Sequence, residues 1–319
     1  MVWQRVILNE SELIRRLSER LPALPPEVVV PIGDDCAVLR LGGDLWAAAA
    51  DMLVEGRHFR GWASPEDVGY KAVAVNVSDV AAMGGVPRFV LASGGAPDPE
   101  TTLRCMHGVM EACEQFGVYS LGGDTTGAAA LTVDVAILGQ LERSPVLRSG
   151  TRPGDILAVT GELGASAAGL LVLEGGGVGP ERLVKKHLRP EPRVEAGLLA
   201  ALLGARAMID LSDGLASDVR RICEMSGVGC RIDLRLLPVA GDTREYLRSV
   251  GRDPEIVVAT GGEDYELLIA APEEVVEALK ARSETPITVV GEVTETDVVF
   301  VRAGEIVENL SGWDHFAGS

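Results

Sequence analysis

The stretch of this chain best equipped for chemistry is Met208-Ile209-Asp210-Leu211-Ser212-Asp213-Gly214-Leu215. An apolar run ends in two aspartates and a serine, and a helical pattern starts after the glycine. In a strand, side chains alternate between the two faces, so Asp210 and Ser212 would point the same way. Asp213 would then be the N-cap of the next helix. Two carboxylates and a hydroxyl at a strand end suit a divalent cation, although an N-cap and one surface aspartate would explain most isolated stretches of this kind.

The same combination of small residues and aspartate recurs five more times along the chain. The further positions are Gly33-Asp34-Asp35, Asp51, Ser78-Asp79, Gly123-Asp124 and Glu263-Asp264. Most of them follow an apolar strand or begin a helix, and α/β proteins bind ligands at the ends of strands. If such carboxylates lay ~5 Å apart, each pair would repel by about 3 kcal/mol at an effective dielectric constant near 20. Convergence would therefore require cations such as Mg²⁺, which binds carboxylates together with substrate phosphates. The alternative is a set of separate helix caps and turn aspartates.

A phosphate site also needs positive charge, and Arg148 could supply it, because a guanidinium binds phosphate in bidentate fashion. Arg148 could equally be a solvated charge in a linker. Lys71 is a second candidate, but its helical context predicts a position on a helix surface. His58 could orient a substrate phosphate, and a structural role is the simpler alternative. Trp313 and Phe316 could stack on a flat heterocycle or merely anchor the C-terminal tail.

The elements that must position these side chains alternate between strands and helices, with one crossover roughly every 25–35 residues, which predicts an α/β fold built from α+β layers. The segment 143–154 contains two prolines and two glycines and predicts a domain boundary. We therefore expect two domains with mixed sheets, residues 1–142 and 156–319, joined by a linker over 143–155. A strand is predicted over 257–260, leading into Gly261-Gly262-Glu263-Asp264.

Composition limits the partners. The chain has 319 residues, enough for two substantial cores, and a net charge of −18. That charge argues against nucleic acid or an anionic membrane as a partner, whereas phosphates remain possible if divalent cations lie between them. The charged N-terminal region predicts no signal peptide, and the longest apolar helical run, 196–205, is about half of the ~20 residues that a membrane span needs. The five cysteines are odd in number and lack CxxC spacing, which indicates reduced, mostly buried residues in a soluble cytoplasmic protein.

Several common motifs are missing from the chain. We find no GxxxxGK(S/T), GxGxxG, HExxH or GxSxG pattern. The sequence is therefore not typical of a P-loop nucleotide binder, a dinucleotide enzyme, a zincin or an α/β-hydrolase.

Taken together, the motifs resemble those of one family, the thiamine-monophosphate kinases, in the superfamily that includes aminoimidazole ribonucleotide synthetase. The resemblance extends from about residue 10 to residue 316. The matching stretches are Ile32-Gly33-Asp34-Asp35, residues 51–59, residues 74–87, Gly122-Gly123-Asp124-Thr125-Thr126, Arg148-Ser149-Gly150, residues 208–215, residues 261–268 and Trp313-Asp314-His315-Phe316.

The resemblance implies an activity and a set of site residues. The activity is ATP-dependent phosphorylation of thiamine monophosphate to thiamine diphosphate, with several Mg²⁺ ions and with no covalent nucleophile or dedicated base. The N-terminal domain would be a synthetase-like ATP-binding domain, and members pair as homodimers through their N-terminal sheets. Implied magnesium ligands are Asp34, Asp35, Ala50, Asp51, Asp79, Asp124, Asp210 and Asp213. Implied ATP contacts are Gly123, Asp124, Arg148 and Ser212. Implied contacts to the thiamine phosphate are His58, Glu263, Trp313 and Phe316.

One position departs from the family pattern. Ala49-Ala50 precede Asp51, where the family usually has two threonines, so a hydroxyl is lost and only backbone carbonyls could coordinate. The alternatives to a thiamine-monophosphate kinase are another ATP-dependent synthetase of the same superfamily and a non-catalytic acidic metal-binding protein. A selenide or carbamoyl-transfer member should carry a reactive cysteine in a Gly-rich N-terminal loop or at the C-terminus, and the chain has neither.

Overall fold

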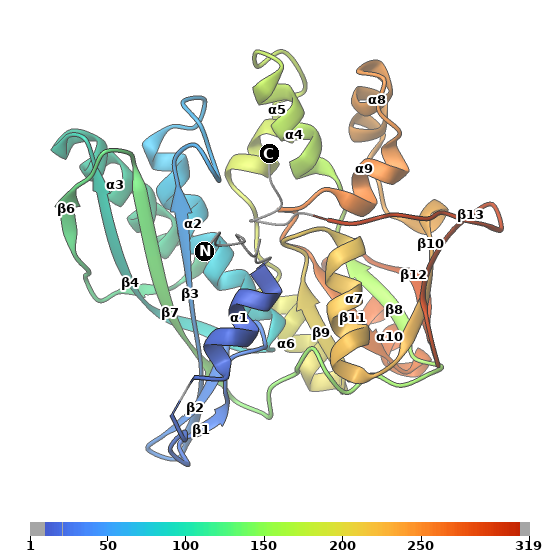
Figure 1. Cartoon of the computed structure of the whole chain (residues 1–319). Coiled ribbons are helices and arrows are strands. Elements are labelled where there is room, and N and C mark those ends of the chain that lie inside the picture. Colours follow the sequence, from blue (N-terminus) through green and yellow to red (C-terminus); the bar gives the residue numbers. More distant parts are fainter. Residues whose placement is uncertain (1–9, 21, 313–319) are drawn as a thin grey trace, which may run out of the picture.

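The computed structural model of the protein describes residues 10–20 and 22–312, and it contains two seven-stranded sheets that lie side by side (Figure 1). Both sheets mix parallel and antiparallel pairs and carry helices. The predicted α/β class with two mixed sheets is confirmed. The first sheet ends at Leu141 and the second begins at Ile156.

The N-terminal sheet has the strand order β1-β2-β3-β7-β4-β5, with β6 beside β4. Its strands are β1 (Val28–Val30), β2 (Ala37–Leu41), β3 (Asp44–Val54), β4 (Val86–Ala96), β5 (Tyr119–Ser120), β6 (Thr125–Gly127) and β7 (Thr132–Leu141). The long strands β3, β4 and β7 form its centre. Burial alternates along β7, where Val133, Val135 and Ile137 lie in the core and the residues between them face outward.

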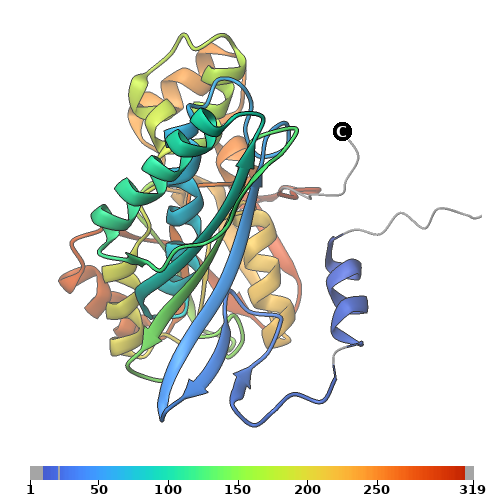
Figure 2. The same ribbon diagram turned by 90° about the vertical axis from the view of Figure 1, so that its left-hand side faces the viewer.

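The helices of this domain are α1 (Glu10–Ser18), α2 (Pro65–Ala82) and α3 (Pro99–Phe116). Local sequence explains where the two long ones begin. The Ser64 side chain accepts a hydrogen bond from the backbone of Asp67 at the start of α2, and Asp98 does the same for Thr101 at the start of α3. A proline occupies the first helical position of each. Both helices pack on the same side of the sheet (Figure 2).

The C-terminal sheet has the order β14-β13-β10-β12-β8-β11-β9. Its strands are β8 (Ile156–Thr160), β9 (Ala207–Asp210), β10 (Gly229–Asp233), β11 (Leu267–Ala271), β12 (Ile287–Thr294), β13 (Val298–Arg302) and β14 (Glu305–Ile306). Its helices are α4 (Ala165–Glu174), α5 (Glu181–Leu188), α6 (Val194–Leu203), α7 (Leu215–Ser226), α8 (Gly241–Ser249), α9 (Pro254–Thr260) and α10 (Glu273–Arg282), with a short 3-10 turn at Leu234–Leu236.

Helix α2 lies between the two domains and touches β9 and α6 of the C-terminal domain. Two glycines allow the close approach. A Cβ atom on Gly197 of α6 would lie 2.2 Å from the carbonyl oxygen of Ala81, and one on Gly84 would lie 2.5 Å from Cβ of Ala201. Ala82, from the N-terminal domain, belongs to a buried apolar cluster with Ala196 and other residues of the C-terminal domain. The domains are therefore joined by a close-packed contact as well as by the linker.

Two expectations about local structure are wrong. Residues 257–260 belong to helix α9 and not to a strand, because Asp253 caps the helix through the backbone N–H of Glu255 and Pro254 occupies its first turn. Asp213 is not the N-cap of α7, because Gly214 takes that position at φ +103°, a conformation that disfavours other residues.

Other expectations hold. All five cysteines are free and buried, as predicted. Among the helices of the described chain, none combines the length and the apolar character needed to cross a lipid bilayer.

The contact between α2 and α6 predicts that Gly197→Ala destabilises the protein by about 1–3 kcal/mol, because the new methyl group would overlap the Ala81 carbonyl. Thermal unfolding should show a lower Tm. Gly241→Ala, in the first turn of α8 with no atom within 4 Å of its Cβ, is the matched control and should leave the Tm unchanged or slightly raised. Equal Tm values for the two variants would contradict the close packing.

Candidate active site

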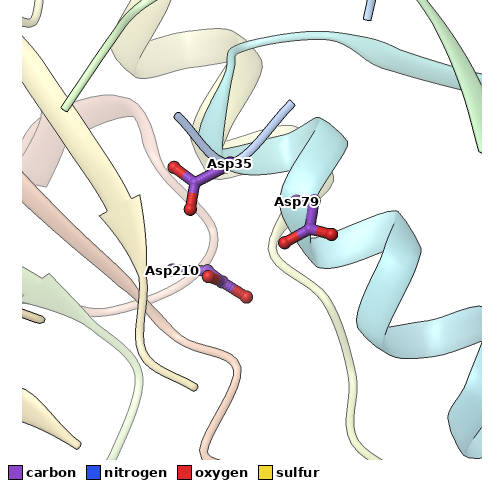
Figure 3. Close-up of side chains that lie close together, drawn as sticks. All are labelled: Asp35, Asp79 and Asp210. Carbon is purple, nitrogen blue, oxygen red and sulfur yellow. The ribbon is translucent and has the colours of Figure 1, made fainter. Parts of the chain in front are cut away.

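Three predicted carboxylates meet between the domains. Asp35 lies just before β2, Asp79 lies near the C-terminal end of α2, and Asp210 is the last residue of β9. One oxygen of each lies within 4.8 Å of those of the other two. Figure 3 shows the three carboxylates gathered between α2 and the end of β9. The convergence predicted from the sequence is thus present for these three side chains, two from one domain and one from the other.

Burial makes this cluster electrostatically unfavourable without a cation. Burial and the neighbouring Asp35 raise the pKa of Asp210 to about 7, although a hydrogen bond of 2.6 Å from the Ser78 hydroxyl partly offsets them. Burial, and then the charges of Asp51 and Asp210, raise the pKa of Asp79 well above its usual range. One carboxylate oxygen of Asp35, Oδ2, is buried without a hydrogen-bond partner. These features fit oxygen ligands that await a divalent cation.

Asp34 and Arg148 adjoin the cluster. The backbone N–H of Arg148 donates to both carboxylate oxygens of Asp34 at 3.2 Å, and burial together with Asp35 raises the pKa of Asp34 to about 6. The Arg148 guanidinium binds Asp35 through Nη2 at 2.6 Å and Nε at 3.2 Å. The side chain of Arg148 keeps 20% of its surface exposed. Arg148 is therefore an arginine held inside the site and not a solvated linker charge.

A large cleft of about 1180 Å³ extends from this cluster, and both domains line it. The cluster end is lined by the predicted residues Asp34, Asp35, Ala50, Asp51, Asp79, Arg148, Asp210, Ser212 and Asp213. The lining also includes His58 and Glu263, together with apolar residues such as Trp62, Leu170 and Val257. The cleft thus combines the acidic cluster with apolar surface, which suits a ligand that carries both a phosphate and a heterocycle.

Ala49 and Ala50, which stand where the family usually has two threonines, lie in the part of β3 that has a neighbouring strand on only one side. Strand β2 pairs with β3 up to Ala48, whereas β7 continues beside it to Val54. Beyond Ala48 the edge of β3 on the β2 side has no paired strand among the described residues, and Ala50 and Asp51 both line the cleft.

Some predicted residues lie elsewhere. Gly123 and Asp124 are exposed beside β4 and are absent from the described lining of the cleft. The structure gives Gly123 a packing reason, since a Cβ there would lie 1.7 Å from the carbonyl oxygen of Ala92. Asp264, adjacent to Glu263, accepts hydrogen bonds from the backbone of Gly164 and Ser166 at the start of α4. Trp313 and Phe316 lie outside the described residues.

The prediction that Lys71 lies on a helix surface is wrong. The residue is 5% exposed, and its Nζ lies 2.8 Å from Oε1 of Glu263 in the other domain. The prediction failed because α2 is covered on nearly every side by the sheet, α3 and α6, so a charged residue in its sequence could not be assigned to solvent.

Sequence reasoning also missed the residues that hold Asp213. Its carboxylate pairs with Arg221 of α7, and Arg221 binds the fully buried Asp218 at 2.8 Å. Burial raises the pKa of Asp218 well above its usual value, and the Arg221 charge opposes that change. The signal was the spacing of Asp218 and Arg221, three apart on one helix, with Asp213 just before it.

Comparison with known proteins agrees with this geometry. Residues 33–141 match the family model "AIR synthase related protein, N-terminal domain", and residues 152–304 match its C-terminal domain. The thiamine-monophosphate kinase of Escherichia coli K12 is 36% identical over 97% of this chain and 98% of its own length. This chain belongs to the thiamine-monophosphate kinase family. The Bacillus subtilis member is 39% identical over 74% of this chain and 76% of its own length.

A solved structure in this family extends the comparison to ligands. AaThiL complexed with AMPPCP and TMP is 34% identical in sequence, has a TM-score of 0.85 and covers 97% of each chain. That protein therefore binds an ATP analogue and TMP on the same two-domain frame.

The raised pKa values predict an unusual pH dependence of stability in metal-free protein. The folded state holds protons on Asp210 that the unfolded state loses near its ordinary pKa of 3.8, so the free energy of unfolding falls as pH rises from about 4 through about 7. Asp210→Asn removes this loss. In chelator, we expect the variant to have a Tm several degrees above the wild type at pH 8, with the difference disappearing near pH 4.

Added Mg²⁺ should raise the Tm of the wild type and have less effect on Asp210→Asn. Asp44→Asn, at the exposed start of β3, is the control and should follow the wild type at every pH. A wild-type Tm that does not respond to pH or Mg²⁺ would contradict a cation-dependent cluster.

Proposed function

We propose that this protein transfers the γ-phosphate of ATP to thiamine monophosphate and so produces thiamine diphosphate and ADP. The observation that carries the proposal is the convergence of Asp35, Asp79 and Asp210 from two domains, in a chain of this family, at one end of a shared cleft. A cleft that combines carboxylates with apolar surface suits two phosphate-bearing substrates, each with an aromatic heterocycle.

The reaction is a direct in-line transfer. The terminal phosphate oxygen of thiamine monophosphate attacks the γ-phosphorus of ATP, and the bond from that phosphorus to the β-γ bridging oxygen breaks. The attacking oxygen is already an anion, so the chain needs no strong general base and forms no phosphorylated intermediate. Such transfers depend on positioning and on neutralisation of charge.

Magnesium fits the donor set of the acidic end, which offers carboxylate oxygens and the orphaned Oδ2 of Asp35. Asp34, Asp35, Asp51, Asp79, Asp210 and Asp213 would hold it, with the backbone carbonyl of Ala50. When bound there, Mg²⁺ supplies positive charge that neutralises the approaching phosphates. Asp124 remains a ligand implied by the resemblance alone.

Arg148 is the residue best placed to contact ATP phosphates from the protein side. Its contacts to Asp35 use Nε and Nη2, which leaves Nη1 to face a phosphate. Burial lowers its pKa and the charges of Asp35 and Asp210 raise it, and the net result lies above the ordinary value. Arg148 therefore stays cationic. Ser212 lines the same end of the cleft and would add a hydroxyl donor, whereas Gly123 would approach ATP only through its backbone.

His58 and Glu263, which also line the cleft, would bind the thiamine monophosphate. Nδ1 of His58 accepts the backbone N–H of Val54 at 3.0 Å, so Nε2 carries the proton that can be donated to the substrate. Glu263 offers a carboxylate to the amino group of the pyrimidine or to the thiazolium cation. Trp313 and Phe316 remain predicted contacts to these rings.

The outer face of the N-terminal sheet supports the proposed homodimer. It carries a row of aromatic rings, with Trp46 stacked on Phe89 at 6.1 Å and Phe89 beside Tyr119 at 6.4 Å. Leu91 and Tyr119 on this face are 49% and 67% exposed. Helices α2 and α3 cover only the opposite face (Figure 2). An exposed apolar face of this kind is typical of a protein interface, and a second copy would bury it.

The proposed activity predicts that protein, ATP, Mg²⁺ and thiamine monophosphate together yield thiamine diphosphate, detected by chromatography. Asp79→Asn and Asp210→Asn should each lower kcat by on the order of 100-fold or more while the protein remains folded, because both carboxylates are needed at the reacting phosphates. Chelator should abolish turnover, and Asp44→Asn should retain it. Absence of the product, or full activity of both site variants, would favour the synthetase or the non-catalytic alternative.

The proposed dimer predicts that Leu91→Glu yields a monomer in light scattering coupled to size-exclusion chromatography, because the new charge would be buried in the interface. Val178→Glu is the matched control, since Val178 is 85% exposed in the loop between α4 and α5, away from the sheet. The control should remain a dimer. A monomeric wild-type protein would contradict the assignment of this face.

A further inference from the structure

Lys71 is a buried cation that connects the two domains beside the cleft. It projects from the middle of α2, its side chain is 6% exposed, and Nζ lies 2.8 Å from Oε1 of Glu263. A buried ammonium is costly unless an anion pairs with it, and Glu263 is the anion present. The two residues come from different domains, so the pair forms only when both domains are in place.

The backbone of Glu263 is fixed by the loop between α9 and β11. Glu263 has φ +65°, a left-handed conformation that is uncommon outside glycine. Its N–H donates to the carbonyl of Ser212 at 2.7 Å, and Gly262 packs so closely that a Cβ there would lie 2.4 Å from that same oxygen. Local strain of this kind persists only where surrounding contacts determine it. The loop thus fixes the backbone position of Glu263, and the partners of the Glu263 side chain fix the direction of its carboxylate.

His187 of α5 is a neutral partner on the other carboxylate oxygen. Its Nδ1 lies 3.4 Å from Oε2 of Glu263 and 3.0 Å from the hydroxyl of Ser166. Burial, and then the positive charge of Lys71, lower the pKa of His187 to about 3, so the ring carries no charge at neutral pH. Lys71 is therefore the cation that pairs with Glu263, and His187 contributes geometry.

The other ionisable groups near Glu263 do not replace Lys71. They are His58, whose charge when protonated would act in the same direction, and Tyr265, whose pKa is raised by burial and by Glu263 itself. Burial alone would raise the pKa of the Glu263 carboxyl, but the charge of Lys71 and its hydrogen bond to the carboxylate bring that pKa below the ordinary value of 4.5.

The position of Lys71 separates its role from that of Glu263. Glu263 and His187 belong to the described lining of the cleft, and Lys71 does not. Lys71 instead lies behind them, beside a small internal space that is also lined by Phe59 and Trp62. Its ion pair with Glu263 is therefore its direct contact with a carboxylate that lines the cleft.

We propose that Lys71 is a positioning residue for the substrate, which keeps Glu263 ionised and directs its carboxylate at the heterocyclic part of the phosphate acceptor. This inference rests on the proposed function, since it takes thiamine monophosphate as the acceptor. The pair complements an acceptor that carries a ring cation or an amino donor. Because Lys71 pairs with Glu263 and not with Arg148 or Ser212, the proposed ATP contacts, we expect it to have little effect on the nucleotide.

The test compares steady-state kinetics of the wild type and Lys71→Met, which keeps the length of the side chain and removes its charge. We expect KM for thiamine monophosphate to rise about tenfold or more, with KM for ATP within about twofold of the wild type. Without the ammonium, burial raises the pKa of Glu263, so the variant regains the ionised carboxylate only at higher pH. The KM of the variant for thiamine monophosphate, divided by that of the wild type, should therefore fall as pH rises from 6 to 8. Lys71→Arg should restore much of the binding.

A double-mutant cycle separates positioning from general destabilisation. In a Glu263→Gln background, Lys71→Met should change KM for thiamine monophosphate by less than twofold, because its target is gone. Lys280→Met is the matched control, since Lys280 pairs with Glu277 at the same distance of 2.8 Å in an exposed ion pair on α10. That variant should behave as the wild type in both KM values.

A stability series tests the same pair without turnover. In Lys71→Met the folded-state pKa of Glu263 lies above its unfolded value, so stability is lost as pH rises from about 4.5 through the raised pKa. The double variant Lys71→Met with Glu263→Gln should therefore have a higher Tm than Lys71→Met alone, and the difference should grow as pH rises. Failure of the wild type to form thiamine diphosphate would refute the proposed function alone. An unchanged KM in Lys71→Met, additive effects in the cycle, or parallel Tm curves for the single and double variants would overturn the role of Lys71.

Discussion

Repulsion among buried carboxylates is the constraint that organises this molecule. Asp35, Asp79 and Asp210 lie within 4.8 Å of one another in a region with little solvent, and each raises the free-energy cost of ionising the others. A fold tolerates such a cluster when cations or protons balance it and when other contacts hold its members in place. Here the Ser78 hydroxyl, the Arg148 guanidinium and the interface between the domains provide those contacts.

Helix α2 carries one residue of the carboxylate cluster and one residue of the ion pair with Glu263. Asp79 belongs to the acidic cluster, and Lys71 lies eight residues earlier, about 12 Å along the helix axis at the rise of ~1.5 Å per residue. The same rigid element therefore sets the separation between the carboxylate cluster and the Lys71–Glu263 pair. Both residues face partners in the C-terminal domain, Asp210 and Glu263. The proposed acceptor-binding pair is thus held at a fixed distance from the proposed cation site by one helix and not by flexible loops.

Sequence reasoning was strongest where side-chain chemistry was concentrated in short stretches. The two mixed sheets, Arg148 and the convergence of Asp35, Asp79 and Asp210 were predicted, because carboxylates that recur at strand ends indicate a shared ligand site in an α/β fold. Sequence reasoning failed where contacts between distant parts of the chain determine the local structure or the burial of a residue. The apolar run before Gly261 suits a strand as well as a helix, and only the capping pair Asp253-Pro254 distinguishes them. The burial of Lys71 depends on the opposite domain, and no local pattern around α2 reports that domain.

The glycine contacts between α2 and α6 have a consequence for how such chains diverge. Because Gly197 and Gly84 leave no room for a methyl group, any gain of volume on one helix has to be matched by a loss on the other. The two helices belong to different domains but must be inherited as a unit. A chimaera that joined the N-terminal half of one homologue to the C-terminal half of another would therefore assemble correctly only if its crossover preserved a matched pair of helices, even though the natural seam of the chain lies at the linker.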